Sequence, residues 1–111
     1  MEKARAKRAC GINCVWEDAL ANYIVSYDLN GPRPTHAELD AHIHKASGHY
    51  GRVLETVWYV GTDWSLVELH DHLKSILRPE DRLLVVQASD ATWYNLLVRT
   101  DSLRGAWERH R

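Results

Sequence analysis

The chain has 111 residues and a mass of 12.8 kDa, which is the size of one domain. Hydrophobic residues make up 45% of it and charged residues 26%, and this balance excludes a disordered polyelectrolyte. The net charge of -1 excludes a strong overall field for nucleic acid or anionic membrane. No apolar run reaches the ~20 residues of a membrane-spanning helix. Cys10 and Cys14 are the only cysteines, so we exclude a disulfide scaffold and expect a reducing, cytoplasmic location.

Residues 1–20 differ from the rest of the chain, and we interpret them as an N-terminal extension. The first eight residues hold four basic side chains against one acidic side chain, whereas 21–111 hold 10 basic and 12 acidic ones. One hypothesis makes the extension a translated leader, because codons for WED at 16–18 can spell a purine-rich ribosome-binding site and Leu20 can be encoded by a start codon. The alternative is a native basic helix.

The first half of the folded region is a predicted strand, turn and helix. NYIVSYDL at 22–29 is rich in β-branched and aromatic residues and is too short for a typical helix, which predicts a central strand. One glycine and two prolines at 30–34 predict a turn. Thr35 and Glu38 then form a capping box that begins a helix, and Gly48 supplies its C-terminal stop.

The second half repeats this alternation. Residues 52–62 alternate in character, but eleven residues are long for one strand, so we expect a bent strand or a hairpin. Ser65 and Glu68 form a second capping box, followed by apolar residues at helical spacing up to Pro79. The apolar run at 82–88 predicts a buried strand.

Residues 89–111 predict helical additions, with Asp90 capping a short turn and Asp101 or Ser102 capping a last helix. The preceding order alternates strands and helices, and right-handed crossovers place both helices on one face of the sheet. The sequence therefore predicts an α+β fold. It is a ferredoxin-like β-α-β-β-α-β plait over 21–88, with 89–111 as a C-terminal helical segment of the same domain.

Three short stretches resemble a known family: YDL at 27–29, TVW at 56–58 and EDR at 80–82. They are similar to segments of the small CRISPR-associated adaptation protein that partners the integrase. The virulence-associated protein D toxins share that fold and its early acidic residue. The longer stretches ANYIVSYDLNGP, GRVLETVWYVG and DRLLVV resemble small bacterial proteins often labelled "SinR family". The β-rich runs argue against the helix-turn-helix repressor that this label suggests.

The resemblance implies a homodimer and divalent-metal-dependent cleavage of RNA or DNA. In the adaptation-protein family the first-strand Asp of each subunit faces its mate across the dimer axis, a role that falls here on Asp28 with Mg²⁺ or Mn²⁺. Read from the residues alone, Asp28 could bind such an ion or cap the turn at 30–31. The alternative function is a non-catalytic dimeric scaffold or interaction module that binds nucleic acid or a protein partner.

Two further sets of residues are candidates for a site. His49, in an expected loop before the second strand, is the best single candidate for a general acid or base. Arg33, Arg52 and Arg82 could form one phosphate-binding patch, and the wider set of arginines that could join it adds Arg78 and Arg99. Because residues 21–111 are net acidic, we expect any nucleic-acid binding by this patch to be weak.

The remaining polar and aromatic residues have simpler interpretations. The other histidines are taken as surface or boundary residues, since each His-X-His pair diverges on its helix. Trp58 and Tyr59 alternate in a strand, so one faces the core and the other faces the open side or a partner. The two cysteines lack a second ligand pair at zinc spacing and are given no function.

Overall fold

The computed structural model describes residues 21–46 and 48–111; the extension, its leader hypothesis and both cysteines lie outside these residues. The described chain has an α+β fold, as predicted, and its four strands form one antiparallel sheet in the order β2-β3-β1-β4. The elements are β1 (Ala21–Asp28), α1 (His36–His44), β2 (His49–Leu54), β3 (Val57–Thr62), α2 (Leu66–Lys74), β4 (Arg82–Ala88) and α3 (Thr100–Arg109).

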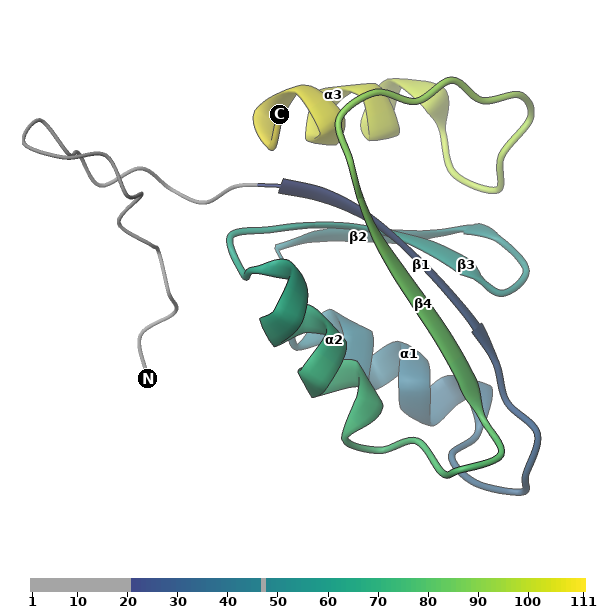
Figure 1. Ribbon diagram of the computed structural model, residues 1–111. Coiled ribbons are helices and arrows are strands. Elements are labelled where there is room, and N and C mark those ends of the chain that lie inside the picture. The colour runs from purple at the N-terminus through teal and green to yellow at the C-terminus, as the bar shows by residue number, and fades with distance from the viewer. Residues whose placement is uncertain (1–20, 47) are drawn as a thin grey trace, which may run out of the picture.

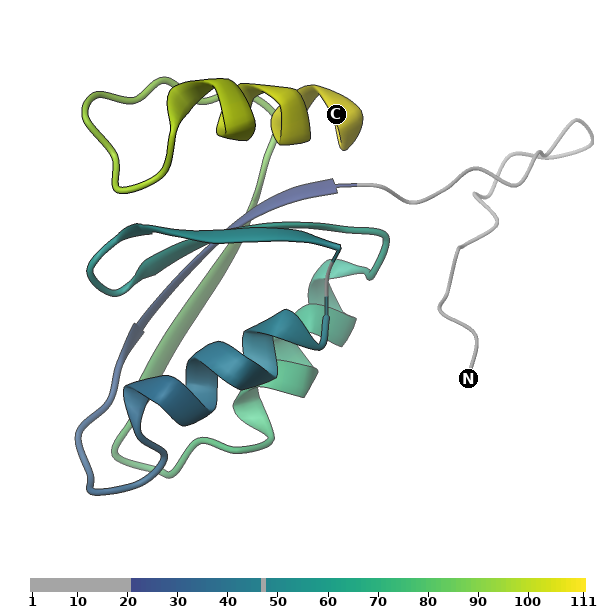
Figure 2. The same cartoon turned by 180° about the vertical axis from the view of Figure 1, so that it is seen from behind.

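Helices lie on both faces of the sheet (Figures 1 and 2). Helices α1 and α2 cover one face, and the core between them and the sheet includes Val25, Leu39, Leu73 and Trp58. Helix α3 lies on the opposite face, where a second core holds Val53, Tyr59, Leu103, Ala106 and Trp107. The neighbours Trp58 and Tyr59 thus serve different cores, and the face expected to be open is partly covered by α3.

Both predicted capping boxes are present. Thr35 Oγ1 accepts a hydrogen bond from the Glu38 amide at 3.1 Å, and Glu38 Oε1 accepts one from the Thr35 amide at 2.8 Å. Ser65 and Glu68 make the same reciprocal pair at the start of α2. The helices end at His44 and Lys74, before the stop signals at Gly48 and Pro79.

The long stretch 52–62 is resolved as a β2–β3 hairpin, one of its two expected forms. The pairing begins earlier than expected, with His49 opposite Gly61, and a register shift lies between Arg52 and Leu54. The expectation that His49 lies in a loop is wrong, because this ladder makes it the first residue of β2.

The C-terminal segment differs from its prediction in two ways. Residues 90–99 contain no helical turn after Asp90. The last helix has Arg99 as its N-cap and no side-chain capping bond, so neither Asp101 nor Ser102 caps it. Helix α3 is held by tertiary packing in place of a local cap, through the buried Leu103, Ala106 and Trp107.

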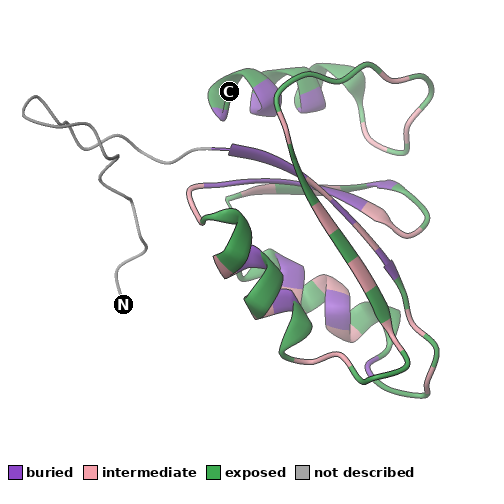
Figure 3. Ribbon diagram, in the orientation of Figure 1, coloured by how far each residue is buried: buried purple, intermediate pink, exposed green. Residues whose placement is uncertain are grey.

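Strand β4 is an edge strand and is not buried on both faces, contrary to the prediction for 82–88. Leu83 and Val85 pack on the α1/α2 side, whereas Leu84 and Val86, which alternate with them, are 60% and 40% exposed. Intermediate and exposed residues alternate along the ribbon of β4 in Figure 3. The reason is the position of α3, which packs over the first part of β1: the Asn22 side chain donates a hydrogen bond to the Trp107 carbonyl at 3.0 Å. No other described element covers the far end of this face, where Leu84 lies.

Candidate functional site

The predicted metal ligand, Asp28, ends β1 beside the edge strand. It is paired in register with Arg82, and Arg82 Nη1 lies 3.9 Å from Asp28 Oδ2 across two exposed side chains. The turn that follows uses other acceptors: the Asn30 amide donates to Asp81 Oδ1 at 2.8 Å, and the Asn30 side chain donates to the Glu80 carbonyl at 2.7 Å. The turn is therefore held without Asp28, whose carboxylate faces solvent.

The described residues of one protomer bring no group of metal ligands to Asp28. Within the described residues no three His, Cys, Asp or Glu side chains come together as a metal-binding group. Asp28 also lies far from the other predicted catalytic residue, because His49 pairs with Gly61, which lies opposite Asn22 at the start of β1. Six residues of strand separate Asn22 from Asp28, about 20 Å at ~3.3 Å per residue. Asp28 and His49 therefore belong to different surfaces.

The three predicted phosphate-binding arginines are each paired with a different carboxylate. Arg33 pairs with Glu38, Arg52 with Asp40 at 2.9 Å, and Arg82 with Asp28 as described above. No hydrogen bond or ion pair joins one of these arginines to another in the part of the chain that the structure describes. A single patch made of these three arginines thus remains a prediction.

Arg33 instead lies beside Arg78, whose Nε donates a hydrogen bond to the Arg33 carbonyl at 3.0 Å. Both arginines line a groove of about 460 Å³ along α1 and the end of α2, together with Pro34, Glu38, Ala41, His42, Lys45 and Ile76. Among the described residues of this lining Glu38 is the only acidic one, and the Arg33 hydrogen bond holds its pKa below the usual range. We call this surface, with Arg33, His42, Lys45 and Arg78 as its basic members, the basic groove.

The sequence analysis did not predict His42 and Lys45 as members of the basic groove. Glu38, His42 and Lys45 follow at spacings of four and three residues, which places them on one face of α1. That spacing was a readable signal. Its meaning depended on how α1 packs against α2, because Arg78 follows α2 in the chain.

A pair of histidines fixes the packing of α1 on α2. The rings of His42 and His72 stack with centroids 3.8 Å apart. His42 Nε2 donates to the His72 carbonyl at 2.7 Å, and His72 Nε2 donates to the His42 carbonyl at 2.8 Å. Burial lowers the pKa of His42 and outweighs the hydrogen bond to the His72 carbonyl, which raises it, while the charges of His72 and Lys45 lower it further. His42 is therefore neutral at pH 7, so the groove's positive charge comes from Arg33, Lys45 and Arg78.

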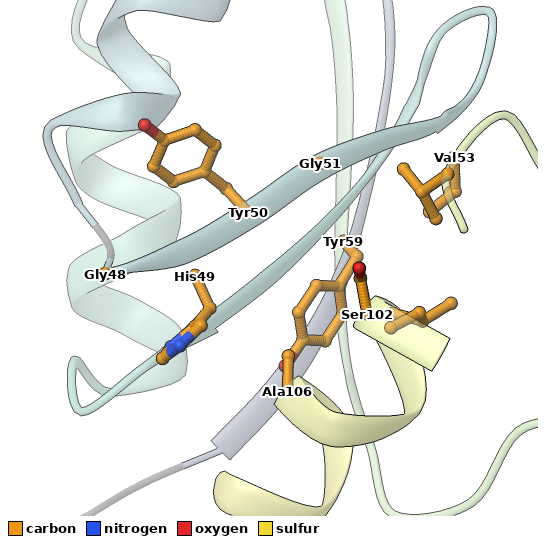
Figure 4. Close-up of a pocket in the computed structure, with 10 residues that line it drawn as sticks. Gly48, His49, Tyr50, Gly51, Val53, Tyr59, Ser102 and Ala106 are labelled. Carbon is orange, nitrogen blue, oxygen red and sulfur yellow. The ribbon is translucent and has the colours of Figure 1, made fainter. Parts of the chain in front are cut away.

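His49 forms one wall of a second cavity, of about 220 Å³, between β2 and α3 (Figure 4). Its Nε2 accepts a hydrogen bond from Arg109 Nη1 at 2.8 Å, and its ring centroid is 4.8 Å from that of His110. Burial lowers the pKa of His49, and His110 and Arg109 lower it further. A neutral imidazole has the right protonation state for a base. However, no Asp or Glu is among the described residues that line this cavity.

Comparison with known proteins finds no matching family, no matching curated protein and no matching solved structure. None of the helices in the described residues has the length and apolar character needed to cross a membrane.

Proposed function

We propose that the chain is a ferredoxin-like plait that works as a homodimeric module binding the phosphate backbone of a nucleic acid. The fold assignment is supported by the order β-α-β-β-α-β and by the central place of β1 between β3 and β4. Helix α3 is then an addition that covers part of the face left open by the plait.

The proposed dimer forms by antiparallel pairing of two β4 edges. An uncovered edge with apolar side chains is a template for another strand, and Leu84 and Val86 are both exposed there. With the two-fold axis at Val85, Leu84 of one protomer pairs with Val86 of the other, and the Val85 residues of the two protomers pair with each other. Cross-strand apolar pairs of this kind stabilise a sheet, so β4 is self-complementary.

The basic groove is the observation that carries the binding function. Lys45 has no carboxylate within ion-pair distance among the described residues, and neither has Arg78, whose side chain bonds only to a backbone carbonyl. Cations without internal partners are available to phosphate oxygens, which supply most of the affinity in non-specific nucleic-acid binding.

Dimerisation by β4 doubles this surface. Two antiparallel strands in one sheet are related by an axis perpendicular to the sheet, so elements on one face of each copy stay on the same side. Helices α1 and α2 of both copies, and both basic grooves, then face one way. A single strand or duplex could contact both grooves, which raises its apparent affinity.

The test is equilibrium binding of a fluorescent RNA and a fluorescent DNA at low salt. We expect affinities of about 10⁻⁴–10⁻⁶ M. The double variant Lys45→Gln/Arg78→Gln should bind about ten-fold or more weakly, because two phosphate contacts are lost. The matched control Arg99→Gln/Arg104→Gln removes the same charge from the α3 side and should bind as wild type does. No binding at low salt would reject nucleic acid and favour a protein partner.

Metal-dependent cleavage by Asp28 is the second candidate, favoured by the exposure of its carboxylate. It requires two Asp28 side chains to meet around Mg²⁺ or Mn²⁺. In the β4 dimer the two Asp28 residues are six strand positions apart, about 20 Å along the strand direction alone. Cleavage therefore needs a dimer other than the β4 dimer. If the protein cleaves nucleic acid and Asp28→Asn abolishes cleavage while the fold is kept, the β4 dimer is wrong.

A further inference from the structure

We propose that the cavity between β2 and α3 binds a small organic monocarboxylate with an apolar body. Its floor is apolar, with Val53, Val98, Leu103 and Ala106 among the lining residues. At about 220 Å³ it is smaller than the ~300–1,000 Å³ of sites for drug-sized ligands, so the ligand is about the size of benzoate.

The carboxylate follows from a charge next to the cavity: Arg109 is not one of the lining residues but is hydrogen-bonded to the lining residue His49. Arg109 donates one hydrogen bond to His49 Nε2, and no carboxylate of the described residues lies within ion-pair distance of it. Arg111, two residues away, is instead paired with Glu108 and Asp90. A guanidinium has five N–H donors, so Arg109 keeps donors for a carboxylate, which it can hold through two parallel hydrogen bonds.

The residues around the cavity would orient such a ligand along it. Ala106 and Arg109 lie three residues apart on one face of α3, which places the guanidinium beyond the His49 end of the cavity. Ser102 stands nearer the other end (Figure 4). Gly51 keeps the β2 wall open, because a Cβ there would lie 3.1 Å from the Val98 side chain. The carboxylate would therefore sit at Arg109, beside His49, with the apolar body toward Leu103.

The experiment is a titration of ¹⁵N-labelled full-length protein with sodium benzoate, followed by amide chemical shifts. We expect shifts confined to residues 48–53 and 98–109 and a Kd of about 1 mM, reasonable for so small a ligand. Arg109→Gln should weaken binding about ten-fold or more, since it removes a charge-assisted hydrogen bond. Ser102→Leu, at an exposed position, should block the cavity sterically. Arg111→Gln is the matched control and should bind as wild type does.

Four results would overturn the proposal. Benzyl alcohol has the same ring without the carboxylate, so equal binding of the two compounds would remove the role of Arg109. Unchanged affinity in Arg109→Gln would also remove the role of Arg109. The absence of amide shifts with benzoate would show that the cavity does not bind a monocarboxylate of this size. Shifts of the lining amides on concentrating the protein without benzoate would assign the cavity to a second copy of the chain.

Discussion

The buried hydrogen bonds that tie α3 to the sheet make a sharp prediction for Tyr59→Phe. The Tyr59 hydroxyl donates to Asn22 Oδ1 at 2.6 Å, and the Asn22 side chain donates to the Trp107 carbonyl. Tyr59 and Asn22 are each 2% exposed. Phe keeps the apolar ring but removes the donor and leaves the Asn22 oxygen buried without it. Such a change costs about 1–3 kcal/mol of unfolding free energy.

Urea unfolding followed by Trp fluorescence measures this cost. With a urea m-value of about 1–3 kcal/mol/M for a small domain, the midpoint should fall by roughly 1 M. Tyr94→Phe is the matched control, because Tyr94 is 90% exposed and its change should stay within about 0.5 kcal/mol. Equal midpoints for the two variants would refute the argument that α3 is anchored through Tyr59 and Asn22.

The burial of the Tyr59 hydroxyl also predicts an effect at alkaline pH. Burial raises the pKa of Tyr59 from 10.0 to about 12, so the unfolded chain loses this proton first as pH rises. Stability should therefore fall between pH 10 and 12, and it should fall less in Tyr59→Phe. Part of the fall should remain in the variant, because burial also raises the pKa of Tyr27.

Three further predictions follow from the helix pair, the edge strand and the predicted metal ligand. Burial lowers the pKa of His42 and His49 below 6.5, so the unfolded state binds these protons first and urea midpoints should fall as pH drops through about 6.5; a midpoint that rises would contradict this sign. Leu84→Lys should keep the fold, as measured by far-ultraviolet circular dichroism, while light scattering reports a monomer in place of the proposed dimer, and a persistent dimer would exclude the β4 interface. Asp28→Asn should leave nucleic-acid affinity nearly unchanged, and a large loss would place the phosphates at Asp28.

Local hydrogen bonding explains which elements could be predicted. The capping boxes at Thr35 and Ser65 depend on contacts within four residues, and the structure has both of them. Helix α3 has no such local signal at its start. Its position depends on the packing of Leu103 and Trp107 against Tyr59 on the face of the sheet opposite α1 and α2. This packing also determines which residues of β4 stay exposed. Such contacts between residues far apart in the chain cannot be predicted from short stretches of sequence.

The candidate sites show the same division. The arginines could be recognised as phosphate ligands, but their grouping depends on tertiary structure: Arg33 lies against Arg78, whereas Arg52 and Arg82 each pair with a separate carboxylate. Lys45 belongs to the basic groove because it lies on the same face of α1 as Glu38 and His42. The Arg109–His49 contact joins residues 60 positions apart, and no spacing rule brings them together.

The salt dependence of nucleic-acid binding tests the proposed function most directly. Each phosphate neutralised steepens the fall of log K with log salt by about 0.7–0.9. The double variant Lys45→Gln/Arg78→Gln should therefore bind with a slope shallower than wild type by about 1.4–1.8 per protomer engaged, and Arg99→Gln/Arg104→Gln should keep the wild-type slope. Equal slopes for wild type and Lys45→Gln/Arg78→Gln would show that the phosphates lie elsewhere and would contradict the basic groove as the binding surface.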